Sequence, residues 1–193
     1  MKNALLILAF VLLSLQAYCQ SKNSLSLVCA VASDNVFDIG IGGPGYSTEG
    51  GQMYGLNYTR NITKVFSIET GLEYSVNNLL WDYEDAYNPH FIPQKVSVKM
   101  LSVPIYANFT FLKYLFANAG ITADFETSHQ SDEIVTNQSG IGLELGIGGK
   151  YNFNRMTVFI NPLIQMHAIV AFHNENSGSL LDQGVKFGIG YRF

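Results

Sequence analysis

The sequence has few charged residues, few cysteines and little electrostatic character. Asp, Glu, Lys and Arg make up 13% of its 193 residues, and the formal net charge is −4. This slight acidity lacks the basic surface that nucleic-acid binding requires, so nucleic acid is not an expected partner. Of the two cysteines, Cys19 and Cys29, only Cys29 lies beyond the amino-terminal segment, which excludes a disulfide framework.

Long apolar runs are also missing, except at the amino terminus. There Lys2 precedes an apolar stretch, Ala4 to Leu15, and the small-x-small cleavage pattern Ala17-Tyr18-Cys19. We predict that residues 1–19 are a signal peptide and that residues 20–193 form one domain. A lipoprotein modified on Cys19 is the alternative, which the bulky Tyr18 disfavours. Beyond this segment no run reaches the about 18 apolar residues of a membrane-spanning helix.

What the domain does contain is alternation of apolar and polar residues. From Val185 to Phe193 every second residue is apolar or aromatic, with Lys, Gly, Gly and Arg between them. Alternation at this period places the two sets on opposite faces of a β-strand. An aromatic residue at the end of such a strand, here Phe193, is typical of the closing strand of bacterial outer-membrane barrels. We therefore expect the barrel-assembly machinery to recognise this strand.

Seven further segments follow the same rule, which gives eight predicted strands. They cover residues 24–43, 52–59, 65–76, 96–111, 114–126, 140–153, 156–172 and 185–193. Their connections alternate between long and short, as do the outer loops and periplasmic turns of outer-membrane barrels. Lipid offers no hydrogen bonds, so strands can span it only in a closed barrel. The predicted fold is all-β, an eight-stranded antiparallel up-and-down transmembrane β-barrel in contact with the lipid of the bacterial outer membrane.

Periodicity alone does not say which face is inside, and a soluble lipocalin-type barrel would be apolar within. The glycines of the less apolar face, such as Gly71, Gly120 and Gly142, suit a crowded lumen and favour the membrane barrel. Aromatic residues of the apolar face are expected to form a girdle near the short turns. These are Tyr58, Phe66, Phe109, Phe111, Tyr151, Phe153, Tyr191 and Phe193, with Tyr54, Tyr74, Phe125 and Phe172 for an outer girdle.

The polar face is predicted to fill the lumen with an ion-paired network. Eight strands enclose a space that side chains can fill, and charges confined there are costly unless paired. The residues expected to form this network are Glu69, Glu73, Asp124, Glu126, Glu144, Lys150, His167, Lys186 and Arg192. Because acids outnumber Lys and Arg in this set, we expect either an inward Lys99 after a phase slip at Met100-Leu101 or a protonated carboxyl. Pro104 lacks an N–H and predicts a local defect in strand pairing.

Three short motifs resemble those of a known family. They are Gly71-Leu72-Glu73-Tyr74-Ser75, Leu101-Ser102-Val103-Pro104-Ile105-Tyr106 and Gly188-Ile189-Gly190-Tyr191-Arg192-Phe193. The sequence resembles the PorT-like outer-membrane β-barrel domain of Bacteroidetes over most of the predicted domain. The resemblance implies an eight-stranded barrel in the outer membrane. It implies no settled activity, since the link of that family to protein secretion belongs to particular members.

Catalytic, metal and cofactor sites are not expected. The segment Gly40 to Gly45 matches G-x-G-x-x-G, but no helix follows to receive phosphates. Asp82, Glu84 and Asp85 lack the spacing and turn glycine of an EF-hand. The four histidines are scattered, and a lipid deacylase would need a histidine beside an outward-facing serine and a carboxylate. The histidines are His90, His129, His167 and His173.

The longest connection carries the clearest candidate for partner binding. Its aromatic residues are Trp81, Tyr83, Tyr87 and Phe91. Aromatic residues in a loop are typical anchors for partner proteins, although they could equally rest at the lipid interface. We therefore predict a non-enzymatic outer-membrane barrel. It would act through its outer loops on an extracellular or envelope protein, or serve as an envelope or secretion-associated structural component. A lipid-modifying acyl hydrolase or transferase is the alternative, and a small channel comes third.

Overall fold

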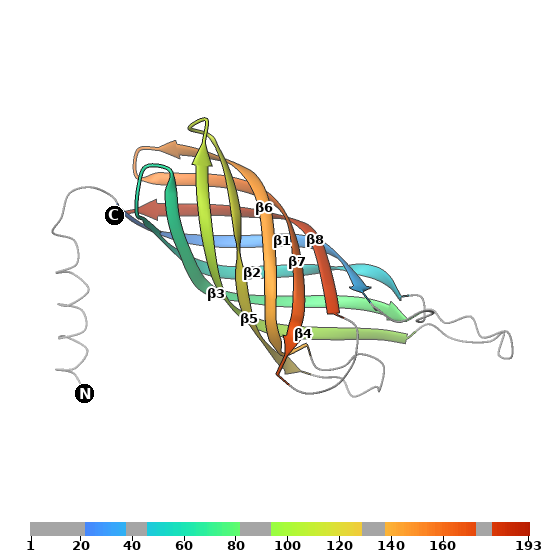
Figure 1. The fold of residues 1–193 in the computed structure, drawn as a ribbon. Coiled ribbons are helices and arrows are strands. Elements are labelled where there is room, and N and C mark those ends of the chain that lie inside the picture. The colour runs from blue at the N-terminus through green and yellow to red at the C-terminus, as the bar shows by residue number, and fades with distance from the viewer. Residues whose placement is uncertain (1–21, 38–45, 82–93, 129–137, 173–178) are drawn as a thin grey trace, which may run out of the picture.

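In the computed structural model, residues 22–37, 46–81, 94–128, 138–172 and 179–193 are described. They form eight antiparallel strands, each paired with its neighbours in the chain, and β1 pairs with β8 to close a barrel (Figure 1). The strands are β1 (Asn23–Phe37), β2 (Tyr46–Asn61), β3 (Phe66–Trp81), β4 (Gln94–Phe111), β5 (Leu115–Ser128), β6 (Gly140–Phe153), β7 (Met156–Ala171) and β8 (Ser179–Arg192). The predicted fold class is confirmed. These described residues include no helix of a length and hydropathy that would cross a membrane.

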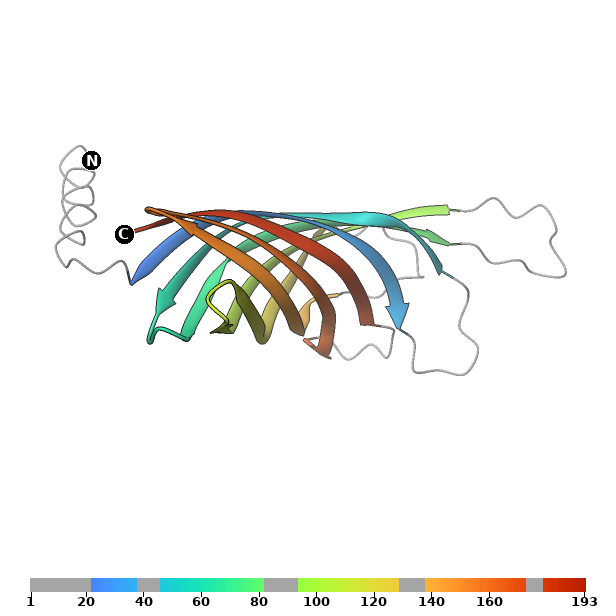
Figure 2. The same ribbon diagram turned by 90° about the horizontal axis from the view of Figure 1, so that it is seen from above.

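The start of β1 and the end of β8 lie together, at the end of the barrel that carries the short turns. Asn23 and Phe193 exchange backbone hydrogen bonds of 3.3 and 2.9 Å there. The β2–β3, β4–β5 and β6–β7 connections lie at this same end, and β3 and β4 project at the opposite end (Figures 1 and 2). Short turns face the periplasm in outer-membrane barrels. The short-turn end is therefore the periplasmic end, and the other is the outer end.

Several strands are longer than predicted, mainly at the outer end. β2 begins at Tyr46 rather than residue 52, because Tyr46 pairs with Trp81. Trp81 in turn pairs with Gln94, so it is the last residue of β3 and not part of a loop, which corrects the prediction. Strand pairing needs only backbone groups, whereas apolar alternation is required only where strands cross lipid. Tyr83, Tyr87 and Phe91 lie outside the described residues, as do residues 40–45.

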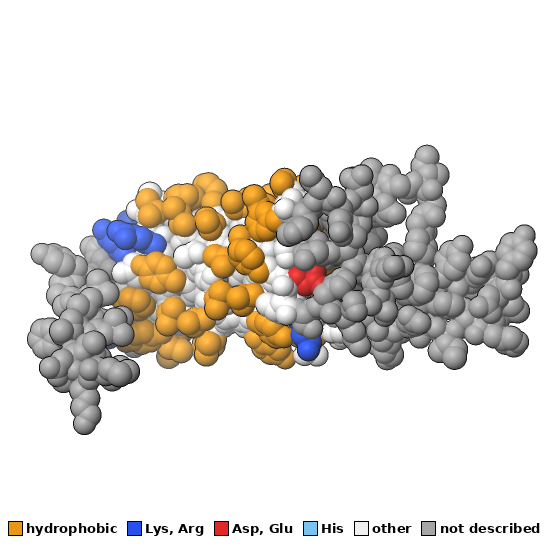
Figure 3. Space-filling view, turned by 90° about the horizontal axis from the view of Figure 1, so that it is seen from below, with side chains coloured by type: hydrophobic (Ala, Val, Ile, Leu, Met, Phe, Trp, Pro, Cys, Tyr) orange, Lys and Arg blue, Asp and Glu red, His pale blue; other side chains and the backbone are white. Residues whose placement is uncertain are grey.

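The barrel is apolar outside and polar inside. Leu27, Ile147 and Ile164 are 64%, 60% and 53% exposed, whereas Glu144 is fully buried and Lys186 is 2% exposed. Hydrophobic side chains are spread along the described barrel wall in Figure 3, and few charged side chains lie among them. A soluble lipocalin-type barrel has the opposite arrangement, so this alternative is excluded.

Aromatic residues gather on the lipid face near the short turns, as predicted. Phe66 and Phe109 pack at a ring-centroid distance of 5.0 Å, and Tyr114 stacks on Tyr151 at 6.2 Å. On the lipid face towards the outer end, Phe125 lies 6.1 Å from Phe172. Rings at these two levels match the interfacial girdles of membrane barrels.

β4 departs from its predicted phase. Val98 and Met100 are buried in the lumen, in step with the inward residues that follow them along the strand. The irregularity is instead in the pairing of β4 with β5, whose register shifts between Lys99 and Met100. Lys99 therefore stays on the face opposite Val98 and Met100, and its predicted inward turn is wrong. The β3–β4 register skips the residues opposite Pro104, the pairing defect expected of a residue without an N–H.

Candidate functional site

The middle of the lumen is closed by a cluster around Lys186, on β8. Its Nζ donates to Glu144 Oε2 at 3.0 Å and to Glu73 Oε1 at 3.1 Å. The three side chains come from β8, β6 and β3, so they meet across the barrel. At most 2% of each side chain is exposed. One cation thus holds two carboxylates together in the interior of the barrel.

Neutral groups add further hydrogen bonds to these carboxylates, although Glu73 Oε2 is buried without a partner. Glu144 accepts from Tyr106 Oη at 2.6 Å and from Asn118 Nδ2 at 2.7 Å, and Glu73 accepts from Asn57 Nδ2 at 2.8 Å. The ammonium of Lys186 lies 5.0 Å from the centre of the Tyr106 ring. We refer to Glu73, Tyr106, Glu144 and Lys186 as the central plug.

Tyr106 reaches the plug because Gly120 makes room for its ring. A Cβ on Gly120 would lie 2.7 Å from Tyr106 Cα and 2.8 Å from Tyr106 Cδ1, and it would also contact the carbonyl oxygen of Ile105. Inward glycines such as Gly120 therefore make room for large side chains in a crowded lumen, as the sequence predicted.

A second cluster lies around His167, on β7. Its Nδ1 is 2.8 Å from Asp124 Oδ2, and its Nε2 is 3.1 Å from Asp182 Oδ2. A neutral imidazole has a single N–H, so only a protonated ring can donate to both carboxylates. Asn77 donates to the same oxygen of Asp182 at 3.3 Å. We call His167, Asp124 and Asp182 the histidine cluster.

Asp182 was missed by the sequence reasoning because it was assigned to the last loop. β8 begins at Ser179, and its alternation extends back from Lys186 through Gly184 and Asp182 to the buried Leu180. Extending the period of two by a few residues would have placed Asp182 in the lumen.

The other members of the predicted network lie outside these two clusters. Glu126 accepts from the backbone N–H of Gln138 at 2.8 Å. Glu69 accepts from Asn57 and Asn108, both at 2.9 Å. Lys150 donates to Thr110 Oγ1 at 2.6 Å, and Arg192 donates to the carbonyl oxygen of Asn154. Asn57 links Glu69 to Glu73 of the plug, since its Nδ2 donates to both. The network is therefore not one continuous chain of ion pairs.

The arrangement of His167 does not suit acyl transfer. Its ring is buried, with 1% of the residue exposed, and both nitrogens face carboxylates rather than a serine hydroxyl. A lipid acyl chain on the outer face of the barrel could not reach it. His90, His129 and His173 lie outside the described residues. Within the described ranges no three His, Cys, Asp or Glu side chains gather in a way that could hold a metal ion.

The lumen is not filled along its whole length, contrary to the sequence-based expectation. Between the central plug and the periplasmic turns lies a cavity of about 720 Å³. Small inward residues such as Ser26 and Ser67 leave this space open. The channel through the barrel thus ends at the plug.

These features define an outer-membrane β-barrel protein with a plugged lumen. Residues 5–193 match the outer membrane protein beta-barrel domain family, and the chain belongs to this family. The comparison with functionally curated proteins gives no match.

Solved structures of similar shape include bacterial outer-membrane proteins. OprG from Pseudomonas aeruginosa is 14% identical, with 89% of this chain and 96% of that chain covered and a TM-score of 0.55. Ail from Yersinia pestis is 14% identical, with coverages of 89% and 99% and a TM-score of 0.45. The barrel domain of Pseudomonas aeruginosa OprF is 15% identical, with coverages of 87% and 97% and a TM-score of 0.42. The likeness to OprG shows the shared fold alone.

Proposed function

We propose that this protein is a non-conducting, non-enzymatic barrel that acts through the connections at its outer end, or as an envelope or secretion-associated structural component. The observation that carries the proposal is the central plug, in which Lys186 binds Glu73 and Glu144 across the lumen. A barrel closed in this way has no path for solutes. What remains for function are the surfaces that the barrel presents at its two ends.

The outer end favours partner contact. β3 and β4 project there, and their connection carries the predicted anchors Tyr83, Tyr87 and Phe91 directly after Trp81. We propose an extracellular or envelope protein as the partner of this connection. Barrel-assembly machinery engaging β8, and a place among the PorT-like barrels, are proposed on the sequence motifs alone.

The two alternatives have less support. A lipid-modifying enzyme would need catalytic groups at the lipid face, and His167 is buried in the lumen instead. A small channel would require the plug to open. Breaking the Lys186 ion pairs would leave charges unpaired in a space of low polarity, which is costly.

The absence of conductance is the first expected result. Purified full-length protein in planar bilayers should show no stable open level across a range of salt concentrations, because the ion-paired plug blocks the lumen. A porin measured in the same bilayers is the positive control. A reproducible, cation-selective unit conductance that Glu73→Gln abolishes would overturn the plug and support the channel.

Removal of the β3–β4 connection tests the role of the outer end. Cells that lack the gene would be complemented with the full chain or with a variant in which a short Gly-Ser linker replaces residues 82–93. We expect this variant to fold and reach the outer membrane, but to lose cross-linking to envelope or extracellular proteins and to leave the envelope defect of the deletion unrepaired. The matched control replaces residues 129–137 of another outer connection. Full complementation by the variant lacking residues 82–93 would contradict a role for this connection.

A further inference from the structure

The cavity between the central plug and the periplasmic turns has the dimensions of a small-molecule site. Its volume of about 720 Å³ lies within the about 300–1,000 Å³ of typical ligand pockets. Tyr106, Glu144 and Lys186 of the plug line it at one end, and residues of the β2–β3 turn line it at the other. A molecule can therefore enter only from the periplasm.

Glycines on the barrel wall keep this space open. Phe116 and Phe159 point inward and pack edge to face, with ring centroids 6.0 Å apart. A Cβ on Gly148 would lie 2.8 Å from Phe116 Cζ, and a Cβ on Gly188 would lie 2.9 Å from Phe159 Cε2. Each ring thus occupies room that a side chain at the glycine would need. The two rings lie against the wall as an apolar patch instead of filling the lumen.

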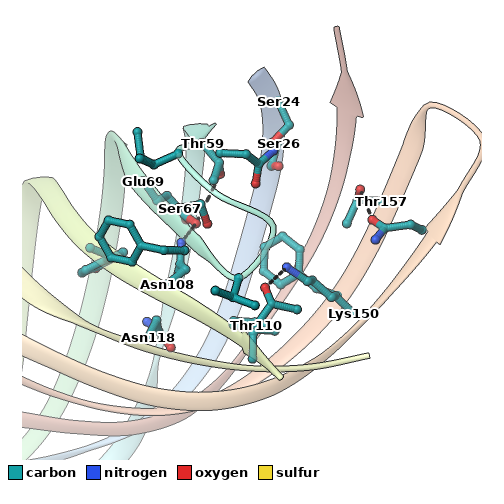
Figure 4. Close-up of a pocket in the computed structure, with 18 of the residues that line it drawn as sticks. Ser24, Ser26, Thr59, Ser67, Glu69, Asn108, Thr110, Asn118, Lys150 and Thr157 are labelled. Carbon is teal, nitrogen blue, oxygen red and sulfur yellow. Dashed lines mark hydrogen bonds between the residues drawn. The ribbon is translucent and has the colours of Figure 1, made fainter. Parts of the chain in front are cut away.

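The rest of the wall is rich in hydroxyl and amide groups. Figure 4 shows them pointing into the cavity from strands around the barrel. They belong to Ser24, Ser26, Thr59, Ser67, Asn108, Thr110, Asn118 and Thr157. Asn108 and Asn118 already donate to Glu69 and Glu144. The hydroxyl groups both donate and accept hydrogen bonds, which matches a ligand that carries several hydroxyls.

The charged groups of the cavity are mainly cationic. The carboxylates that line it are Glu69 and Glu144, against six basic side chains. Glu144 shares the ammonium of Lys186 with Glu73, and Glu69 accepts hydrogen bonds from Asn57 and Asn108. Besides Lys186 of the plug, the basic side chains that line the cavity are Lys22, Lys64, Lys113, Lys150 and Arg192. In the described part of the chain none of these five has a carboxylate within ion-pair distance.

Lys150 and Arg192 are the basic groups best placed within this site. Lys150 Nζ is held by Thr110 Oγ1 at 2.6 Å and lies 5.7 Å from the centre of the Phe116 ring. The Nε of Arg192 is buried without a hydrogen-bond partner. Lys150 therefore offers a fixed positive charge directly beside the aromatic patch.

We propose that this cavity binds a small anionic saccharide from the periplasm, either a sugar acid or a sugar phosphate. Its acidic group would bind Lys150, with Arg192 adding positive charge nearby. Its hydroxyls would bind the Ser and Thr side chains, and the C–H face of its ring would pack on Phe116 and Phe159. Because the plug closes the far end, the barrel holds such a ligand without passing it across the membrane.

Titration calorimetry on the full-length protein in nanodiscs of zwitterionic lipid tests this site. The probes are glucuronate, glucose 6-phosphate and neutral glucose, each also measured at raised salt. We expect at least one anion to bind, with glucose weaker by about tenfold or more, because a charge-assisted hydrogen bond is lost. Binding of glucuronate alone identifies a carboxylate ligand, and binding of glucose 6-phosphate alone identifies a phosphate ligand.

Substitutions of Lys150 test whether this side chain binds the anion. Lys150→Gln should weaken anion binding by about tenfold or more, and Lys150→Arg should retain most of it. Arg60→Gln, at an exposed position outside the cavity, is the matched control and should bind as the unaltered protein does. Heat-modifiable gel mobility establishes that each variant is folded. The proposal is overturned if neither anion binds at millimolar concentration, if glucose binds equally well, or if folded Lys150→Gln binds as Arg60→Gln does.

Discussion

Lys186→Met should lower the free energy of unfolding by about 3–5 kcal/mol, because it removes the only cation of the central plug. Glu73 and Glu144 would then share a buried space without Lys186 Nζ, which now lies 3.1 and 3.0 Å from their oxygens. Removing one partner of a buried ion pair leaves an uncompensated charge, and here it leaves two. Denaturant unfolding in phosphatidylcholine vesicles, followed by Trp fluorescence and gel mobility, measures the effect.

Two further variants separate the plug from a general loss of packing. Lys64→Met changes an exposed lysine in the β2–β3 turn and should alter stability by less than about 0.5 kcal/mol. Adding Glu73→Gln and Glu144→Gln to Lys186→Met removes the unpaired charges and should recover most of the lost stability. This triple variant also covers the case in which Lys186→Met alone does not fold. A single variant as stable as the unaltered protein, or a triple variant that is less stable still, would contradict the assigned role of the plug.

The membrane-crossing part of the fold could be predicted from sequence because lipid and lumen impose opposite chemistry on alternate residues. In β6 the pattern from Ile141 to Phe153 fixes both the strand and its faces, and the structure reproduces the predicted bounds. The prediction was weaker where strands leave the lipid. β2 and β3 continue beyond residues 52 and 76 through backbone pairing alone, so Trp81 was assigned to a loop.

Apolar residues in the lumen were a second source of error. Val98 and Met100 face inward, and a rule that equates apolar with outward therefore inferred a phase slip in β4. The strand keeps its alternation, and the register shift affects only its pairing with β5. An apolar side chain is as favourable when buried in the lumen as in any protein core. The sequence pattern therefore cannot distinguish an apolar residue that faces the lumen from one that faces lipid.

The site depends on contacts across the barrel, which a linear pattern does not contain. Charged residues on inward positions could be recognised one strand at a time, including Glu73, Glu144 and Lys186. Their grouping could not, because it depends on the stagger of strands that are far apart in sequence. The same holds for the cavity, which exists because Gly148 and Gly188 lie beside the rings of Phe116 and Phe159.

Leu145→Arg should lower the free energy of unfolding by about 2–4 kcal/mol, the cost of an arginine near the bilayer midplane of a membrane barrel. Leu145 is 51% exposed on the outer face, about halfway along the apolar positions of β6. Its neighbours across the two strand pairs, Ala119 and Ile164, offer no polar group to an arginine. The arginine would have to draw water or headgroups into the lipid.

Phe153→Arg is the matched control for depth, because it changes the same face of the same strand. Phe153 is 70% exposed at the periplasmic end of β6, where an arginine reaches the headgroups, so its cost should be only about 0–1 kcal/mol. Both variants would be unfolded by denaturant in vesicles of the same lipid, and thinner bilayers should reduce the difference between them. If both substitutions lowered the free energy of unfolding equally, this face of β6 would not be in contact with lipid. A gradient from Leu145 to Phe153 instead locates the apolar band along β6, with the central plug inside it and the mouth of the cavity at its periplasmic edge.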